Sequence, residues 1–128
     1  MEASQKTKSM VNIYKRPLIA ILFTVAIFTL SACSSNSVKT IKYREDSVNV
    51  NTPAFESLDT SKSSWVRGAQ YDAKQEYLII DLQGVNYSYC GVPSDVWDSF
   101  KEAESFGTEY NATIKGHFSC EGLKQPAY

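Results

Sequence analysis

The second half of the chain alternates between hydrophobic and polar residues, and this period of two predicts antiparallel strands. Residues 63–72 (SSWVRGAQYD) and 76–82 (EYLIIDL) flank a turn and predict a β-hairpin. Gln83-Gly84 predicts a second tight turn, after which residues 85–92 (VNYSYCGV) form a third strand. Pro93 ends this strand, because proline lacks the N–H donor that a continuing ladder requires.

The strand pattern assigns side chains to the two faces of the expected sheet. Tyr87 and Tyr89 share one face of the third strand, since side chains alternate along a strand. The strand before it carries apolar side chains on both faces, with Leu78, Ile80 and Leu82 on one face and Tyr77 and Ile79 on the other. The sequence leaves open which of these faces the two tyrosines join, because it does not fix the pairing register.

Residues 94–105 (SDVWDSFKEAES) change to a helical period. Ser94 is expected to cap this helix and Gly107 to end it. Residues 108–118 predict a second, short helix. The apolar stripe of the first helix consists of Val96, Trp97, Phe100 and Ala103. The expected fold class is α+β: a small three-stranded antiparallel sheet packed by one or two short helices.

An apolar run lies near the N-terminus, at residues 18–30 (LIAILFTVAIFTL). Its length of about 13 residues is below the roughly 20 of a spanning helix. Basic residues before it and small residues after it are typical of a secretory signal peptide. The run ends in Leu-Ser-Ala-Cys, which resembles the lipobox of bacterial lipoproteins. The resemblance implies a signal peptide at residues 1–32 and acylation of Cys33. An ordinary cleavage that leaves Cys33 free is the alternative, and the start codon is Met1 or Met10.

Acylation of Cys33 implies a location and a first partner. Two or more acyl chains hold a protein stably on a bilayer, at about 0.8 kcal/mol per buried methylene. The expected location is therefore the bacterial cell envelope, with the protein lipid-anchored, facing the periplasm or at the outer membrane. The expected partner is the membrane itself, bound through the lipid.

Residues 33–62 are rich in Ser, Thr, Asn and charge and predict the lipidated cysteine followed by a flexible tether. As a coil, such a segment spans about 30 Å. Short strands at 38–43 and 47–50, with Phe55 and Leu58 docked on the domain, are the alternative. Residues 121–128 are expected to form a C-terminal tail.

Charge and cysteine content change once residues 1–32 are removed. Four of the 13 basic and one of the 14 acidic residues lie there, so residues 33–128 carry a formal charge of about −4. Cys90 and Cys120 then form an even pair, which in an exported protein predicts a disulfide that staples the domain. Two buried thiols are the alternative.

Several short motifs in fixed order resemble the KTSC domain, named for its place at the C-terminus of some lysyl-tRNA synthetases. The resemblance covers about residues 63–118, and the expected domain extends over residues 63–120. It implies a fold of unknown function, with RNA binding suggested by the synthetase. The matching motifs are Ser63-Ser64, Tyr71-Asp72, Tyr87-x-Tyr89, Val92-Pro93, Ser105-x-Gly107 and Tyr110-Asn111-x-x-Ile114-Lys115.

The candidate binding residues fall into an aromatic set and a polar set. The aromatic set is expected either to contact an envelope protein or glycan or simply to fill the core. In the polar set, Arg67 and Lys115 suit phosphate, but nucleic acid is an unlikely partner because nine basic residues are dispersed among thirteen acidic ones in residues 33–128. The aromatic set is Trp65, Tyr77, Tyr87 and Tyr89, and the polar set is Arg67, Asn111 and Lys115.

The sequence predicts no catalytic residues, no cofactor and no metal site. His117 is the only histidine, and no motif of a hydrolase or metal site is present. The predicted function is a membrane-anchored lipoprotein with a non-catalytic binding domain. The alternatives are an RNA-binding domain or an inhibitor of a cell-wall hydrolase.

Overall fold

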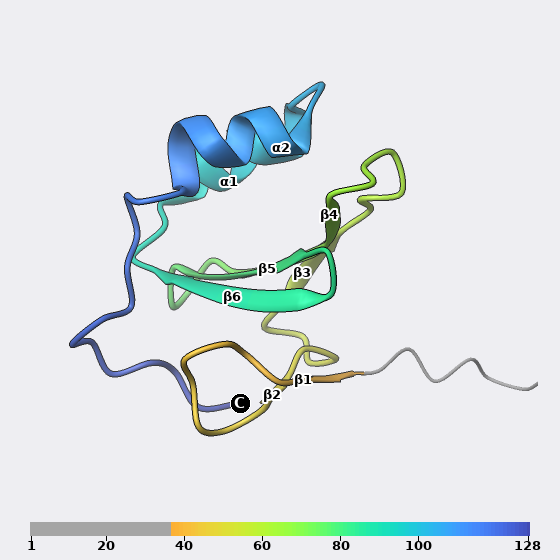
Figure 1. The fold of residues 1–128 in the computed structure, drawn as a ribbon. Coiled ribbons are helices and arrows are strands. Elements are labelled where there is room, and N and C mark those ends of the chain that lie inside the picture. The colour runs from red at the N-terminus through yellow and green to blue at the C-terminus, as the bar shows by residue number, and fades with distance from the viewer. Residues whose placement is uncertain (1–36) are drawn as a thin grey trace, which may run out of the picture. The chain divides into compact units, whose positions relative to one another are not determined.

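A four-stranded antiparallel sheet stands at the centre of residues 37–128, the part of the chain that the computed structural model describes (Figure 1). The strands follow one another in space in the order β3 (Glu56–Leu58), β4 (Val66–Asp72), β5 (Tyr77–Leu82) and β6 (Val85–Cys90). The α+β class is confirmed, but the prediction of three strands is wrong. The additional strand, β3, is three residues long, which is too short for an alternating pattern to reveal it.

The turn between β5 and β6 fixes the register of the two strands. Gln83 and Gly84 have φ values of 54° and 94°, as a two-residue turn of type I′ requires. Tyr89 pairs with Leu78, and Tyr87 pairs with Ile80. Directly paired residues point to the same face, so both tyrosines lie on the face that carries Leu78 and Ile80.

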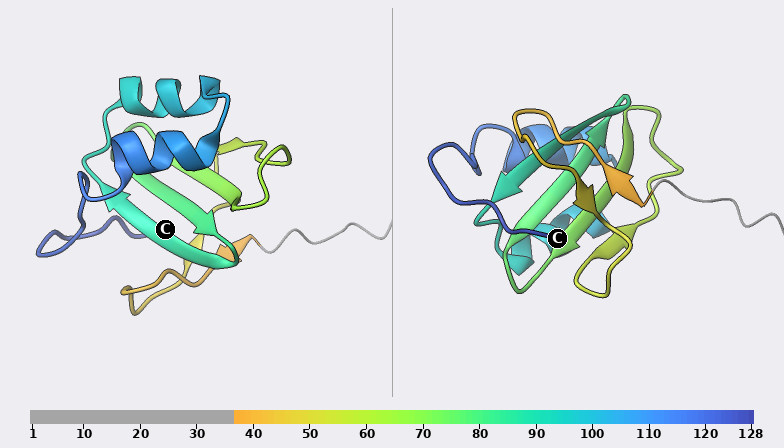
Figure 2. Two further views of the ribbon diagram at one scale, coloured as in Figure 1. Left: turned by 45° about the horizontal axis from the view of Figure 1, so that its top comes forward. Right: turned by 90° about the horizontal axis from the view of Figure 1, so that it is seen from below.

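Short helices cover this first face of the sheet (Figures 1 and 2). They are α1 (Ser94–Glu102), α2 (Phe106–Glu109) and a π-helical turn, η1 (Tyr110–Ile114). Between helices and sheet lies the larger buried core: Val66, Ala69, Tyr71, Leu78, Ile80, Val92, Trp97, Phe100, Phe106, Tyr110 and Ile114. Within residues 37–128, no helix is long and apolar enough to cross a bilayer.

The helix boundaries differ from the expected ones at two residues. Pro93 is the N-cap of α1, and Ser94 is already helical and forms no capping hydrogen bond. Gly107 does not end a helix but lies inside α2, where a Cβ atom would meet the Trp65 ring at 3.2 Å. A side-chain cap is found instead at Ser105, whose oxygen accepts from the backbone N–H of Thr108 at 3.3 Å.

The second face of the sheet is covered by the segment that the sequence predicts to be a tether. In its described part this segment contains β1 (Val38–Lys39) and β2 (Val48–Asn49), which pair with each other, as well as β3. A second buried cluster lies beneath it: Ile41, Val48, Phe55, Tyr77 and Ile79. The expected tether is therefore folded from residue 37 onward, because covering Tyr77 and Ile79 removes apolar surface from water.

The C-terminal tail packs on the same second face (Figure 2). The ring of Tyr128 lies 4.5 Å from that of Phe55 and 5.8 Å from that of Tyr77. Its hydroxyl donates to Asp72 Oδ2 at 2.8 Å, and burial raises the pKa of Tyr128. The Arg44 guanidinium donates to the Pro126 carbonyl at 2.7 Å. The last residues thus form part of the folded structure.

Glu56 joins β3 to α1 and gives the fold an acid-sensitive contact. Trp97 Nε1 and Lys101 Nζ each donate to its carboxylate at 3.0 Å, and these two bonds lower the pKa of Glu56. A carboxyl group whose pKa is lowered on folding stabilises the fold at pH values above its unfolded pKa. This contribution is lost as the pH falls through the folded pKa.

We expect the Glu56→Gln variant to lose less stability than the wild type between about pH 6 and pH 3. The reason is that only the wild type loses a favourable charge when Glu56 becomes protonated. Urea unfolding at several pH values measures the difference, and Glu104→Gln, at an exposed residue, is the control. Parallel pH profiles for the wild type and Glu56→Gln would contradict the prediction.

Candidate functional site

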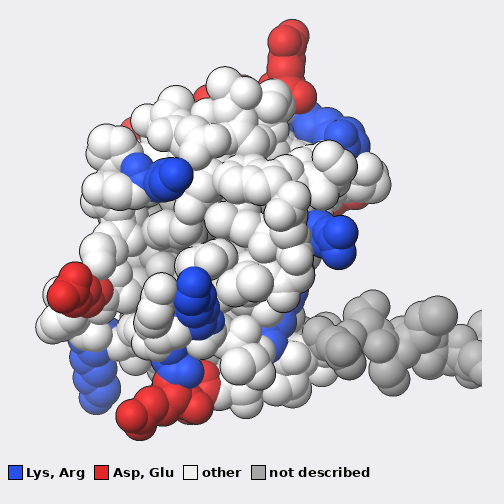
Figure 3. All heavy atoms as spheres, in the orientation of Figure 1, with Lys and Arg blue, Asp and Glu red and all other residues white. Residues whose placement is uncertain are grey.

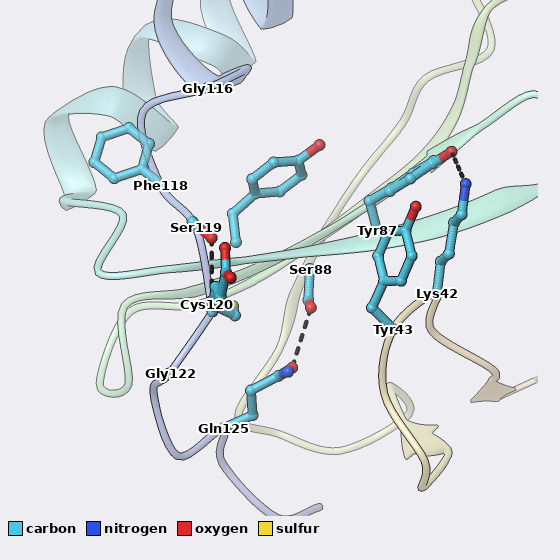
Figure 4. Close-up of a pocket in the computed structure, with 12 residues that line it drawn as sticks. Lys42, Tyr43, Tyr87, Ser88, Gly116, Phe118, Ser119, Cys120, Gly122 and Gln125 are labelled. Carbon is cyan, nitrogen blue, oxygen red and sulfur yellow. Dashed lines mark hydrogen bonds between the residues drawn. The ribbon is translucent and has the colours of Figure 1, made fainter.

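A pocket of about 690 Å³ opens along β6, the last strand of the sheet (Figure 4). Segments distant in the sequence form its walls, because the chain reaches this edge of the sheet three times. The lining residues are Lys42, Tyr43, Tyr87, Ser88, Tyr89, Gly116, Phe118, Ser119, Cys120, Glu121, Gly122 and Gln125.

One wall of the pocket is an aromatic pair that holds a lysine (Figure 4). Lys42 Nζ lies 5.0 Å from the ring centre of Tyr43 and 5.2 Å from that of Tyr87. It also donates to the Tyr87 hydroxyl at 3.4 Å. The neighbouring hydroxyls of Tyr43 and Tyr87 raise the pKa of Lys42, so the wall carries a positive charge. The Tyr43 side chain is 86% exposed.

Tyr87 and Tyr89 have different surroundings although they share a face. The Tyr89 hydroxyl is 2.7 Å from the Tyr110 hydroxyl, and the two rings meet edge to face at 6.0 Å. Burial is the main cause that raises the pKa of Tyr89, and this hydrogen bond is the second. Tyr89 therefore flanks the core, whereas Tyr87 is held by Lys42 at the pocket wall.

The opposite wall is attached by the disulfide between Cys90 and Cys120, whose Cα atoms lie 5.0 Å apart. The predicted pairing of these two cysteines is thus confirmed in the structure. Gln125 closes the pocket below, where its Oε1 accepts from the Ser88 hydroxyl at 3.0 Å and from the Tyr77 hydroxyl at 2.8 Å. Figure 4 shows Ser88 between the two walls.

The predicted aromatic set does not form one surface. Tyr77 is fully buried on the second face of the sheet. Trp65 packs on the helix side, with its ring 5.4 Å from that of Tyr110. Of the four, only Tyr87 and Tyr89 line the pocket. The prediction that all four aromatic residues share one binding face is therefore wrong.

The predicted polar set is also dispersed. Arg67 is exposed and lines a second, shallower hollow of about 450 Å³ near β3. Gln70 also lines this hollow. Asn111 Nδ2 donates to the Gly107 carbonyl at 2.8 Å, within the helical region. Lys115 is exposed directly after η1. On the face shown in Figure 3, Lys and Arg side chains stand apart from one another and form no continuous basic patch.

Sequence reasoning missed several residues of the pocket. Lys42 and Tyr43 lie in the expected tether, and Gln125 lies in the expected tail. The one available signal was the aromatic side chain of Tyr43 in a segment rich in polar and charged residues. Among residues 37–128, no cluster of His, Cys, Asp and Glu side chains could hold a metal ion. Cys33 lies outside the described residues.

Comparisons with known proteins match the central part of the chain. The family model for the KTSC domain matches residues 62–118. Among solved structures, a KTSC domain protein from Yersinia pestis is similar: it is 31% identical, the match covers 52% of this chain and 93% of that one, and the TM-score is 0.48. No curated protein matches. Several pocket residues lie outside the family match, among them Lys42, Tyr43, Cys120 and Gln125.

Proposed function

Residues 62–118 place this chain in the KTSC domain family, and we propose that the protein is a non-catalytic binding module. In this proposal, a lipid on Cys33 anchors it to a membrane of the bacterial envelope. The pocket along β6 holds a partner from the same compartment. No contact in the described part of the chain favours the RNA-binding or hydrolase-inhibiting alternative.

The pocket is the observation that carries the binding proposal. Tyr43 exposes a large apolar ring to solvent, and exposed apolar surface beside a concave site is typical of a binding surface. Lys42 is held between Tyr43 and Tyr87, so a cation and two rings are arranged before any ligand arrives. The pocket lining contains a single carboxylate, Glu121, and no histidine.

The location is supported by two independent features of the sequence and structure. Leu30-Ser31-Ala32-Cys33 follows the apolar run directly and resembles a lipobox. The disulfide between Cys90 and Cys120 suits an oxidising compartment, since thiols in the bacterial cytoplasm are kept reduced.

The anchor is tested by metabolic labelling of cells with an alkyne-bearing fatty acid. We expect the wild-type protein to carry the label in the membrane fraction and the Cys33→Ser variant to carry none, because the thiol is the acceptor. The Ser34→Ala variant is the control and should stay labelled. An unlabelled wild-type protein would overturn the lipid anchor.

Binding at the pocket is tested by photocrosslinking in intact cells of the native host. A photoreactive phenylalanine analogue replaces Tyr43 in one variant and Val38 in another, which is 56% exposed and does not line the pocket. We expect a discrete crosslinked product from position 43 and none from position 38. Identical patterns at the two positions, or no product at all, would argue against a binding role for the pocket.

A further inference from the structure

The outer edge of β6 has backbone groups that its own sheet does not use. In an antiparallel pair, alternate residues direct both their N–H and C=O groups to the neighbouring strand. The two-residue turn makes Leu82 and Val85 the first such pair, so Asn86 and Ser88 direct these groups outward. The Asn86 carbonyl indeed accepts from the backbone N–H of Lys42, at 2.8 Å.

The N-terminal segment covers this edge only at its beginning. Ile41 forms an isolated parallel bridge with Asn86, and the chain then turns away at Tyr43, which has a φ of 66°. Within residues 37–128, no backbone group pairs with the outward N–H or C=O of Ser88. Proteins usually protect such an edge, because unpaired strand groups invite pairing with another chain.

The pocket lies directly along this open stretch of edge. Ser88 is part of its floor, with Lys42 and Tyr43 on one side and Cys120 on the other. The Cys120 Cα is close to the Cys90 Cα, yet its segment makes no backbone hydrogen bond to β6. The four-residue step from Asn86 to Cys90 spans about 13 Å, which is room for a short piece of extended chain.

We propose that the pocket binds an extended peptide segment of a protein partner, which pairs with β6 at Ser88 as an added strand. This inference rests on the proposed binding function and names its ligand class. A peptide backbone offers N–H and C=O groups at the strand spacing that the open edge requires. A glycan does not offer this alternating set.

The surroundings of the edge also define which side chains the peptide carries. Successive side chains of an added strand point to opposite faces. One of them meets the rings of Tyr87 and Tyr89 and is apolar or aromatic. The next meets the polar side, where Ser88 Oγ and Gln125 Oε1 are hydrogen-bonded, and is small or polar.

The test uses the full-length protein in detergent micelles and a phage-displayed library of linear 12-residue peptides. A selected peptide is synthesised with a single N-methyl group at each backbone nitrogen in turn. We expect affinity to fall by at least about tenfold at alternate positions and to change little at those between, because only alternate N–H groups bond to the edge. Tyr87→Ala should also weaken binding, whereas Val38→Ala, outside the pocket, should not.

Amide hydrogen exchange provides a second readout, at the edge itself. Peptide binding should slow exchange of the Ser88 amide and leave that of Ile79, in the interior strand β5, unchanged. If no peptide is selected, if no N-methyl position matters, or if Ser88 exchange stays the same, the inference is overturned. A crosslink from position 43 to glycan alone would also overturn it and would leave the binding function standing.

Discussion

The Phe100→Ala variant is expected to lower the free energy of unfolding by about 3–5 kcal/mol. Phe100 lies on α1 with 0% of its surface exposed. Its ring stacks on that of Trp97 in the same helix at 6.1 Å and meets that of Phe106 in α2 at 5.3 Å, so it joins the two helices within the larger buried core. Alanine would leave a cavity that the surrounding rigid rings fill only in part.

Urea unfolding of the full-length protein in detergent, followed by tryptophan fluorescence, measures this effect. The matched control is Ser99→Ala, one residue away on the exposed side of the same helix. We expect the control to change stability by less than about 0.5 kcal/mol. A Phe100→Ala loss as small as that would mean that the helices are not packed on the sheet as described.

Removal of the disulfide is expected to cost about 3–4 kcal/mol in the Cys90→Ala/Cys120→Ala double variant. The two cysteines are 30 residues apart, and a crosslink of that length restricts the unfolded chain. The effect is large for this protein because a domain of its size has a small core. Urea unfolding of the oxidised wild type and of the double variant measures the difference.

Two controls separate the disulfide from the substitutions. Wild-type protein that has been reduced and blocked at its thiols should lose about as much stability as the double variant. Titration of denatured, unreduced wild type should find no free thiol at Cys90 or Cys120. Two reactive thiols there would contradict the pairing and, with it, the argument for an oxidising compartment.

The sequence predicted the main strands of the sheet and the helix on its first face well, because these strands and this helix have clear periods of hydrophobic residues. The segments assigned to β4, β5, β6 and α1 are found close to their expected bounds. The alternation also showed that Tyr87 and Tyr89 share a face. It could not show which face, because that depends on the register set by the turn at Gln83 and Gly84.

The segment that covers the second face of the sheet was predicted mainly as a tether, with folded strands only as the alternative, although β5 carries a signal for such a cover. Tyr77 and Ile79 are apolar on the face opposite Leu78 and Ile80, and apolar residues on both faces are typical of a strand buried on both sides. The covering elements gave only a weak pattern: short strands at 38–43 and 47–50 were the alternative to a tether, and β1 and β2, which lie in those ranges, are two residues long. Their positions result from contacts with residues far away in the sequence.

The candidate site was predictable only in part, for the same reason. Tyr87 and Tyr89 stood out because they flank a single serine within a clear strand. Lys42 and Tyr43 reach the site because Ile41, directly before them, is buried on the second face of the sheet and bridges to Asn86 in β6. Such a contact depends on the complete fold and leaves no local trace in the sequence.

The early start of β1 limits how far the domain can stand from Cys33. Val38 follows Cys33 by only five residues, and an extended chain advances at most about 3.6 Å per residue, so the separation is no more than about 18 Å. If Cys33 is acylated, the domain must lie close to the headgroups. Its partner must then be embedded in that bilayer or come within a short distance of its surface.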